Sequence, residues 1–203
     1  MKLSMLQQGT PEWHELKRGK IGGTRFGQVI SGKKNNLIYE LLNERLSPWI
    51  DFDDQYIDED MQFGIDNEPV AADLYEKQTG IKFKQVGCIL SDTSPIHLAS
   101  PDRLSEDNSI VLEIKCTQNG RIHLQRFWEG VETSHMAQIK NYFAVSEEVK
   151  EVHWISYCPD RFERPIIPYI FRREMFEQDI PGWLFEVKQI ELRLDKMQQQ
   201  FMF

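Results

Sequence analysis

The sequence predicts an α/β (α+β) fold in which a central mixed β-sheet is flanked by helices. Segments with helical periodicity come first, and short segments in which apolar and polar residues alternate follow them. Further helices and strands end the chain, an order that suits one sheet with helices packed on it. The chain has 203 residues, of which 40% are hydrophobic, so it can bury a substantial core. Because no linker-like stretch divides it, we expect a single domain over residues 1–203.

Helical periodicity predicts four helices before the first strand. They are expected after Thr10, after Thr24, over residues 35–46 and over residues 61–79. Thr10 and Thr24 are suitable N-cap residues, and Gly80 is expected to end the fourth helix. Pro69 conflicts with an uninterrupted fourth helix, so we expect a kink or a start near Glu68.

Alternating segments after the fourth helix predict strands. They cover residues 81–86, 88–90, 96–100, 109–116, 152–158 and 166–171. The clearest is 109–116, in which Glu113 and Lys115 leave one face while Leu112 and Ile114 leave the other. Further helices are expected over residues 121–130, 134–145 and 183–201.

The net charge of −8 argues against a uniformly basic surface for nucleic acid. The charge is uneven, however, because residues 1–40 hold seven Lys or Arg and three Glu, a net of +4, which leaves −12 for the rest. Six acids lie within residues 51–60, where a solvated loop is expected; a metal cage there is the weaker alternative, since EF-hand spacing is absent.

Targeting signals and cysteine motifs are not evident. No apolar run could span a bilayer and the first residues do not form a signal peptide, so we expect no membrane association and a cytoplasmic location, bacterial or in a phage-infected host. The three cysteines form no CxxC pair, which disfavours a disulfide framework or a zinc site.

The most informative pattern is Ser100-Pro101-Asp102, separated by ten residues from Glu113-Ile114-Lys115. A hairpin across residues 103–108 would bring Asp102 beside Glu113 and Lys115. Two carboxylates and the Ile114 carbonyl could hold a divalent cation for phosphodiester hydrolysis, and an ammonium group could hold the attacking water and offset developing negative charge. A Glu-x-Lys pair on a strand is also a common surface ion pair, so the pattern alone leaves both interpretations open.

Five blocks of sequence match one known family in order. They are Trp13–Gly19 with Ile21–Thr24, Gly64–Pro69, Leu98–Asp102, Leu112–Cys116 and His135–Ile139. Together they resemble the phage lambda exonuclease family, the YqaJ-type viral recombinase nucleases of the PD-(D/E)xK superfamily. The resemblance implies a restriction-endonuclease-like core and a metal-dependent exonuclease that degrades linear duplex DNA 5′→3′, leaving 3′ single strands for phage-type recombination by single-strand annealing.

The same resemblance implies cofactors and partners. The expected cofactor is Mg²⁺, as two ions, with Mn²⁺ able to substitute. The expected partners are double-stranded DNA ends and a single-strand annealing protein. The family forms a ring of three chains, so a homo-oligomer, in particular a trimer, is expected; such a ring could bring several basic N-terminal segments to one channel.

The resemblance also assigns catalytic roles to individual residues. Asp102 and Glu113 would be metal ligands and Lys115 the catalytic lysine. Glu68 would add a helix-borne carboxylate that acts on a metal directly or through water, and Gln138 would contact the nucleophilic water or the substrate. For Glu68 the alternative is an ordinary acid near a helix N-terminus, and for Gln138 a solvent-facing side chain.

A 5′-phosphate pocket would map to Lys17, helped by Arg18, and to the hydroxyl of Thr24. A glycine-rich turn with flanking bases before a helix N-terminus is in itself a suitable anion site. Lys17 replaces the arginine of the family and loses its bidentate geometry. Arg103 stands where the family has glycine and is a candidate DNA contact, as is His135.

Two alternative functions are kept. One is a structure-specific or end-processing endonuclease of the same superfamily; its Cas4-like variant is disfavoured because that variant carries four clustered cysteines and this chain has three scattered ones. The other is a catalytically inactive DNA-binding module, disfavoured because the motif residues are complete.

Overall fold

The computed structural model describes residues 1–47, 58–161 and 163–202 and confirms the predicted mixed architecture. Its helices are α1 (Pro11–Lys17), α2 (Gly23–Ile30), α3 (Lys34–Leu46), α4 (Glu59–Thr79), α5 (Gly120–Glu129), α6 (Thr133–Val145) and α7 (Ile180–Met202), with a short 3-10 helix at Arg173–Met175. Its strands are β1 (Lys2–Ser4), β2 (Phe83–Lys84), β3 (Cys88–Leu90), β4 (Leu98–Ala99), β5 (Arg103–Ser105), β6 (Ile110–Cys116), β7 (Glu151–Tyr157) and β8 (Ile166–Arg172). Most of the expected acidic loop, residues 51–57, lies outside the described residues.

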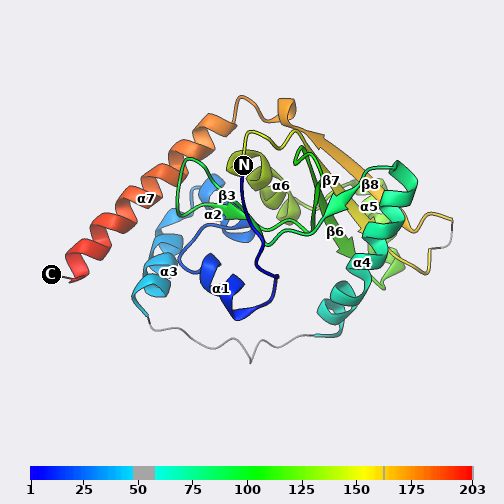
Figure 1. Ribbon diagram of the computed structural model, residues 1–203, viewed down its shortest axis with the longest axis horizontal. Helices are drawn as coiled ribbons and strands as arrows, with labels where there is room; N and C mark the ends of the chain where they lie inside the picture. Colours follow the sequence, from blue (N-terminus) through cyan, green and yellow to red (C-terminus); the bar gives the residue numbers. More distant parts are fainter. Residues whose placement is uncertain (48–57, 162, 203) are drawn as a thin grey trace.

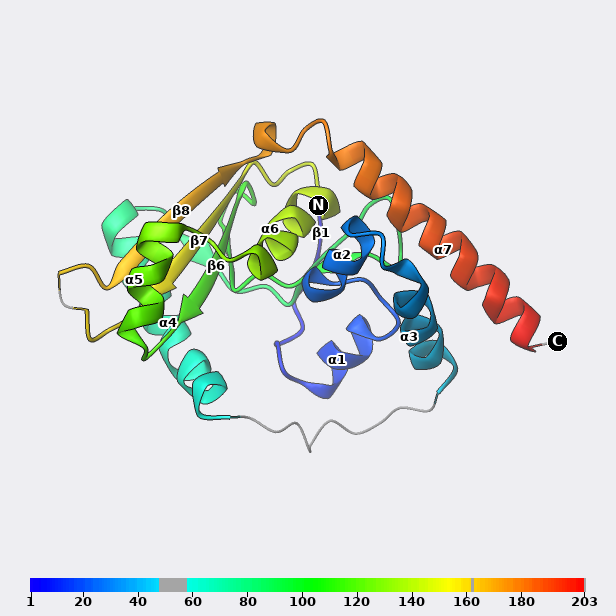
Figure 2. The same cartoon turned by 180° about the vertical axis from the view of Figure 1, so that it is seen from behind.

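The central sheet has the strand order β2-β5-β6-β7-β8 and is mixed, because β6 and β7 pair in parallel while the other neighbours are antiparallel. A smaller sheet has the order β1-β3-β4. The central sheet, α4 and α5 lie toward one end of the molecule, whereas α2, α3 and α7 lie toward the other (Figure 1). Figure 2 shows α6 between these two ends.

Strict alternation along β6 determines what covers each face of the sheet. Leu112 and Ile114 are buried with α4 residues Ala71, Ala72 and Tyr75. Val111 leaves the opposite face and is buried with the α6 residues Ile139, Tyr142 and Phe143. Glu113 therefore faces α6, inside the protein, where a charged side chain needs partners.

Three expectations about element boundaries are corrected. Helix α2 begins after Gly22 without a side-chain cap, so Thr24 lies in its first turn and is not its N-cap. Helix α4 begins at Glu59, where Asp58 accepts from the backbone N–H of Met61, and it continues past Pro69; the predicted start near Glu68 is therefore wrong. The strand that pairs with β6 is β5, because the segment before Asp102 pairs with β3 in the smaller sheet instead.

A second core joins the N-terminal helices to α7. It contains Phe26 from α2, Leu41 from α3 and Leu194 from α7. His97 lies beside it, stacked on the ring of Phe26 at 5.6 Å between centroids. No helix among the described residues is both long enough and apolar enough to cross a bilayer.

His97 is expected to make the stability of the fold sensitive to acid. Burial lowers the pKa of His97 to about 4 from 6.5, although its hydrogen bond to Asn141 acts in the opposite direction. Between pH 4 and pH 6.5 the unfolded chain therefore binds more protons than the folded one. The stability contributed by neutral His97 is present above pH 6.5 and is lost as the pH falls toward 4. Between about pH 7.5 and pH 5, His97 should remove about 2 kcal/mol from the free energy of unfolding.

Urea denaturation at these two pH values measures this effect, with His97→Gln as the comparison. The variant should lose less stability than the wild type over this range, because it lacks the group that takes up the proton. Equal losses in both proteins would contradict the prediction.

Candidate active site

The two halves of the predicted motif meet at the end of β6. Asp102 lies in the bend between β4 and β5, and the register that pairs Arg103 with Leu112 brings it alongside β6. Its carboxylate accepts a hydrogen bond of 2.6 Å from the backbone N–H of Ile114. The strand that pairs with β6 is β5 and not the segment before Asp102, so the hairpin differs from the predicted one. It nevertheless brings Asp102 beside β6 as expected.

Glu113 is the buried centre of this group. It is 1% exposed, and its carboxylate accepts from the ammonium of Lys115 and from the hydroxyl of Tyr142 on α6. Lys115 reaches back along the same face of β6, two residues further on, and keeps 27% of its side chain exposed. A buried carboxylate with two donors is fixed in position.

The charges in this group act strongly on one another. Burial and then the charge of Glu113 raise the pKa of Asp102 well above its usual value, and Glu68 adds to this effect. Burial lowers the pKa of Lys115, but the charges of Glu113 and Asp102 outweigh it and hold that pKa above its ordinary value. The cluster thus carries more negative charge than its ammonium group balances, which is the electrostatic condition for binding a cation.

Glu68 comes to this cluster from the middle of α4, as predicted for a helix-borne carboxylate. It pairs with Arg103, whose side chain is buried and also donates to the carbonyl of Asp102 at 2.6 Å. Arg103 therefore points into the protein rather than toward a DNA backbone, and the interpretation of Arg103 as a DNA contact has no support in this arrangement. Its guanidinium instead compensates the acids next to it.

The donors near Asp102 fit a hard divalent cation. The N–H of Ile114 points toward Asp102, and the N–H and C=O of one strand residue point to the same side, so the Ile114 carbonyl faces Asp102 as well. Carboxylate and carbonyl oxygens are the ligands that Mg²⁺ prefers. Among the described residues no three His, Cys, Asp or Glu are grouped closely enough to hold a metal by themselves. Lys115 and Arg103 are paired with two of the acids.

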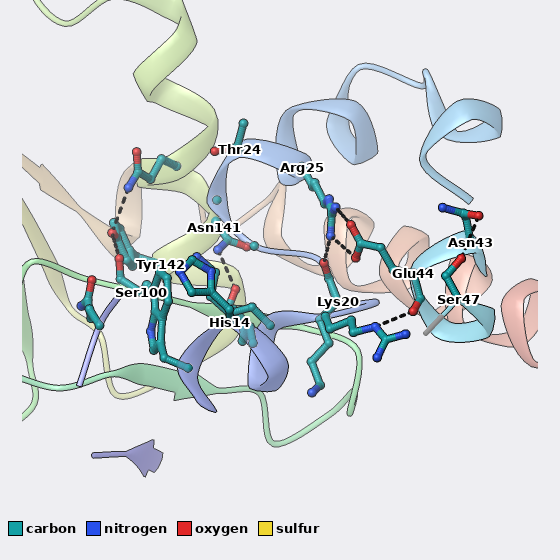
Figure 3. A pocket seen from close by; sticks show the side chains of 18 residues that line it. His14, Lys20, Thr24, Arg25, Asn43, Glu44, Ser47, Ser100, Asn141 and Tyr142 are labelled. Carbon is teal, nitrogen blue, oxygen red and sulfur yellow. Dashed lines mark hydrogen bonds and ion pairs between the residues drawn. The ribbon is translucent and has the colours of Figure 1, made fainter. Parts of the chain in front are cut away.

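The described residues also form a pocket of about 480 Å³ (Figure 3). It is formed by the turn between α1 and α2, the end of α3 and one side of α6. Its lining includes Tyr142, Gln138 and Ser100, and a basic wall made of Lys17, Lys20 and Arg25. Tyr142 lines the pocket and also contacts Glu113, so this one side chain connects the pocket wall to the carboxylate cluster, whose own residues do not line the pocket.

The predicted phosphate-binding residues line this pocket. The ammonium of Lys17 lies 3.6 Å from the ring centroid of Trp13, and burial lowers the pKa of Lys17. Thr24 is exposed in the first turn of α2, whose first N–H groups have no side-chain cap. A Cβ atom at Gly23 would lie 2.8 Å from Gln138 Cγ, so glycine lets α2 approach α6 closely here. Arg18 lines the pocket and donates to the carbonyl of Glu44 at 2.6 Å.

Gln138 and His135 lie on α6 near the cluster. Gln138 donates to the Tyr142 hydroxyl at 3.2 Å, which connects it to Glu113 through one side chain. His135 is half-buried and bonds Glu132 through Nδ1 at 3.0 Å. Burial and the nearby charge of Lys115 lower the pKa of His135. Both residues are therefore close to the centre of the site.

Four residues of the site were not anticipated as functional: Tyr142, Lys20, Arg25 and Glu44. The ring of Tyr142 is buried with Ile139 and Phe143 of α6, whereas its hydroxyl has polar partners. The hydroxyl lies within hydrogen-bond distance of Glu113 and, at 3.0 Å, of the carbonyl of Ser100. A tyrosine on a helix facing a buried acid is the signal that could have identified it.

Comparisons with known proteins agree with this fold. The family model described as the YqaJ-like viral recombinase domain matches residues 12–148. The crystal structure of the alkaline exonuclease LHK-Exo from Laribacter hongkongensis has a TM-score of 0.75 at 24% identity, and that of LHK-Exo in complex with dAMP has 0.76 at 22%; each covers 95% of this chain and 98% of the other. A phage-related exonuclease from Haemophilus somnus 129PT has a TM-score of 0.57 at 12% identity, covering 90% and 96%. A search of curated proteins found no match.

Proposed function

Because this chain belongs to the YqaJ-like viral recombinase family, we propose that it is a metal-dependent exonuclease that degrades linear duplex DNA in the 5′→3′ direction. One observation carries the proposal: Tyr142 lines a pocket with basic side chains and also contacts Glu113, the centre of the cluster that includes Asp102 and Lys115. A strand end bound in the pocket would place a phosphodiester bond near the carboxylates. The names of the structural relatives, an alkaline exonuclease and a phage-related exonuclease, support the same activity.

Asp102, Glu113 and the Ile114 carbonyl would hold Mg²⁺, with Glu68 acting directly or through water. Two ions are proposed, with Mn²⁺ able to substitute; when bound, the metal supplies an activated water and neutralises charge on the leaving oxygen. Tyr142 keeps Glu113 in place. Lys115 holds a positive charge beside the reacting phosphate, where negative charge develops, and Gln138 orients the water or the substrate.

The end of the 5′-terminated strand is proposed to bind in the pocket. Lys17 supplies positive charge, Thr24 a hydroxyl, and the first turn of α2 backbone N–H groups, which together make a site for a terminal phosphate. Arg18 adds charge to the lining of the pocket, and His135 is a candidate contact for DNA nearer the carboxylates. Recognition of a terminal phosphate favours an exonuclease over an endonuclease.

The rest of the proposal concerns the biological setting. The 3′ single strands left by the enzyme would be used in phage-type recombination with a single-strand annealing protein. We propose that residues 1–203 form one nuclease domain that assembles as a homo-oligomer, in particular a trimer, and acts in the cytoplasm. A ring would allow an acidic chain to hold DNA, because the basic residues near each pocket would line a common channel.

A time course on three DNA substrates tests the proposal. We expect linear duplex with a 5′-phosphate to be degraded at least about ten-fold faster than the 5′-hydroxyl duplex at limiting DNA, since the terminal phosphate gains charge-assisted hydrogen bonds in the pocket. A covalently closed circle should remain intact. Cutting of the circle would favour the endonuclease alternative, and DNA binding without degradation of any substrate would favour the inactive module.

A further inference from the structure

Among the described residues, Glu44 is the one carboxylate that lines the pocket. Its side chain is partly buried, and its charge is paired. Its two carboxylate oxygens accept from both terminal nitrogens of Arg25, and Oε2 also accepts from the backbone N–H of Gly19 at 2.8 Å. Its own carbonyl accepts from Arg18 at 2.6 Å. Figure 3 shows Arg25 and Glu44 turned toward each other across the pocket wall.

These contacts join three separate elements. Gly19 is in the turn after α1 and has a positive φ of 65°, Arg25 is in the first turns of α2, and Glu44 is near the end of α3. Arg25 also donates to the carbonyl of Lys20 at 3.0 Å, so it contacts the turn between α1 and α2 directly as well as through Glu44. The turn carries Lys17 on one side and the N-terminus of α2 on the other, so the network fixes the distance between them.

We propose that Glu44 is a positioning residue that holds the basic wall of the pocket in the arrangement that binds the 5′-terminal phosphate. This inference rests on the proposed function for the identity of the ligand. Glu44 itself repels an anion, so its presence in an anion pocket needs a reason. The reason is that a bidentate carboxylate–guanidinium pair defines both the position and the orientation of Arg25, which a single point contact would not.

The ionisation of Glu44 is consistent with this role. Burial raises the pKa of Glu44, but the hydrogen bonds from Arg25 and Gly19 outweigh it and bring that pKa below its usual value. Glutamine has the same shape, yet its NH₂ group would face a donor of Arg25 and the pair would be lost. Glu44→Gln therefore has two effects of opposite sign on phosphate binding. Loss of the repelling charge alone would tighten binding, whereas loss of the contact that positions Arg25 would weaken it.

The test is a binding measurement without metal, so that it does not depend on cleavage. Fluorescence anisotropy compares 5′-phosphorylated and 5′-hydroxyl duplexes on the full chain in EDTA, for the wild type, Glu44→Gln and Glu40→Gln. Glu40 lies one turn earlier on α3, is exposed and carries the same charge, so it controls for the change in net charge. We expect Glu44→Gln to weaken binding of the phosphorylated end about ten-fold, as for other residues that orient a binding group, and to leave the hydroxyl end unchanged.

The same proteins are then assayed for degradation with Mg²⁺. The KM for the phosphorylated duplex should rise in Glu44→Gln while kcat stays within about two-fold, and thermal melting should confirm that the variant is folded. In an Arg25→Met background the effect of Glu44→Gln should be smaller, because the pair is already broken. Equal or tighter binding in Glu44→Gln, or a wild type that binds both ends equally, would overturn the inference. Absence of nuclease activity in the wild type would instead overturn the proposed function, since the binding comparison does not need it.

Discussion

Glu113→Gln is expected to reduce kcat for degradation of linear duplex at least about a thousand-fold. The substitution keeps the shape of the side chain and its contact with Tyr142, but it removes the charge of a proposed metal ligand. Binding of the DNA end should change little, because the pocket that would hold it is lined by other residues. The measurement is initial rate against substrate concentration with Mg²⁺, combined with calorimetric titration of Mn²⁺.

Glu113→Gln loses the ion pair with Lys115 but also removes a repulsion, so its free energy of unfolding should fall by less than that of Lys115→Met, which leaves a buried charge without its ammonium partner. In the wild type, the charge of Glu113 raises the pKa of Asp102, which means that the two carboxylates repel each other within the fold. Removing one charge relieves this repulsion. Glu106→Gln is a matched control, because Glu106 is exposed at the turn between β5 and β6 and carries the same charge. Full activity in Glu113→Gln, with Mn²⁺ binding intact, would refute the proposed catalytic role.

The parts of the site that could be predicted are those determined by short-range sequence. Alternation along 109–116 correctly placed Glu113 and Lys115 on one face of a strand, because side-chain direction in a strand has a period of two. The proximity of Asp102 was also predicted, although through the wrong strand. Pro101 and Asp102 turn the chain from the smaller sheet to the central one, and a periodicity pattern does not contain that change of sheet.

The parts that could not be predicted depend on long-range packing. Strand β1 has no strong strand pattern and forms because β3 offers a pairing edge. Helix α4 continues through Pro69, so packing of Ala71, Ala72 and Tyr75 on the sheet overrides the local cost of proline. The inward position of Arg103 depends on Glu68, thirty-five residues earlier, and no local signal connects them.

The network around Glu44 shows the same limit within the site. The basic residues near the N-terminus were predicted from the sequence to form an anion site, because they cluster around glycines before a helix. The acid that holds them comes from a different helix, nineteen residues after Arg25. Only the folded chain shows that Gly19 and Arg25 converge on it.

Lys115→Met is expected to reduce kcat by about a hundred-fold to ten-thousand-fold, the range usual for loss of a group that moves a proton or offsets charge in the reaction. Methionine preserves the length of the side chain and removes the ammonium group. KM should change little, since Lys115 is not among the residues that line the pocket. Lys150→Met is the control, because Lys150 is exposed and its ammonium contacts only the carbonyl of Glu147 among the described residues.

The same substitution should destabilise the fold, which separates the two roles of Lys115. Without the Lys115 ammonium, Glu113 is left almost fully buried, and among the described residues only the Tyr142 hydroxyl still donates to it. Breaking a buried pair in this way typically costs about 3–5 kcal/mol. The double variant Lys115→Met/Glu113→Gln should recover most of that free energy of unfolding, because no unpaired charge remains at position 113, yet it should stay inactive. If the double variant regained activity together with stability, Lys115 would be a structural partner of Glu113 and not a catalytic residue.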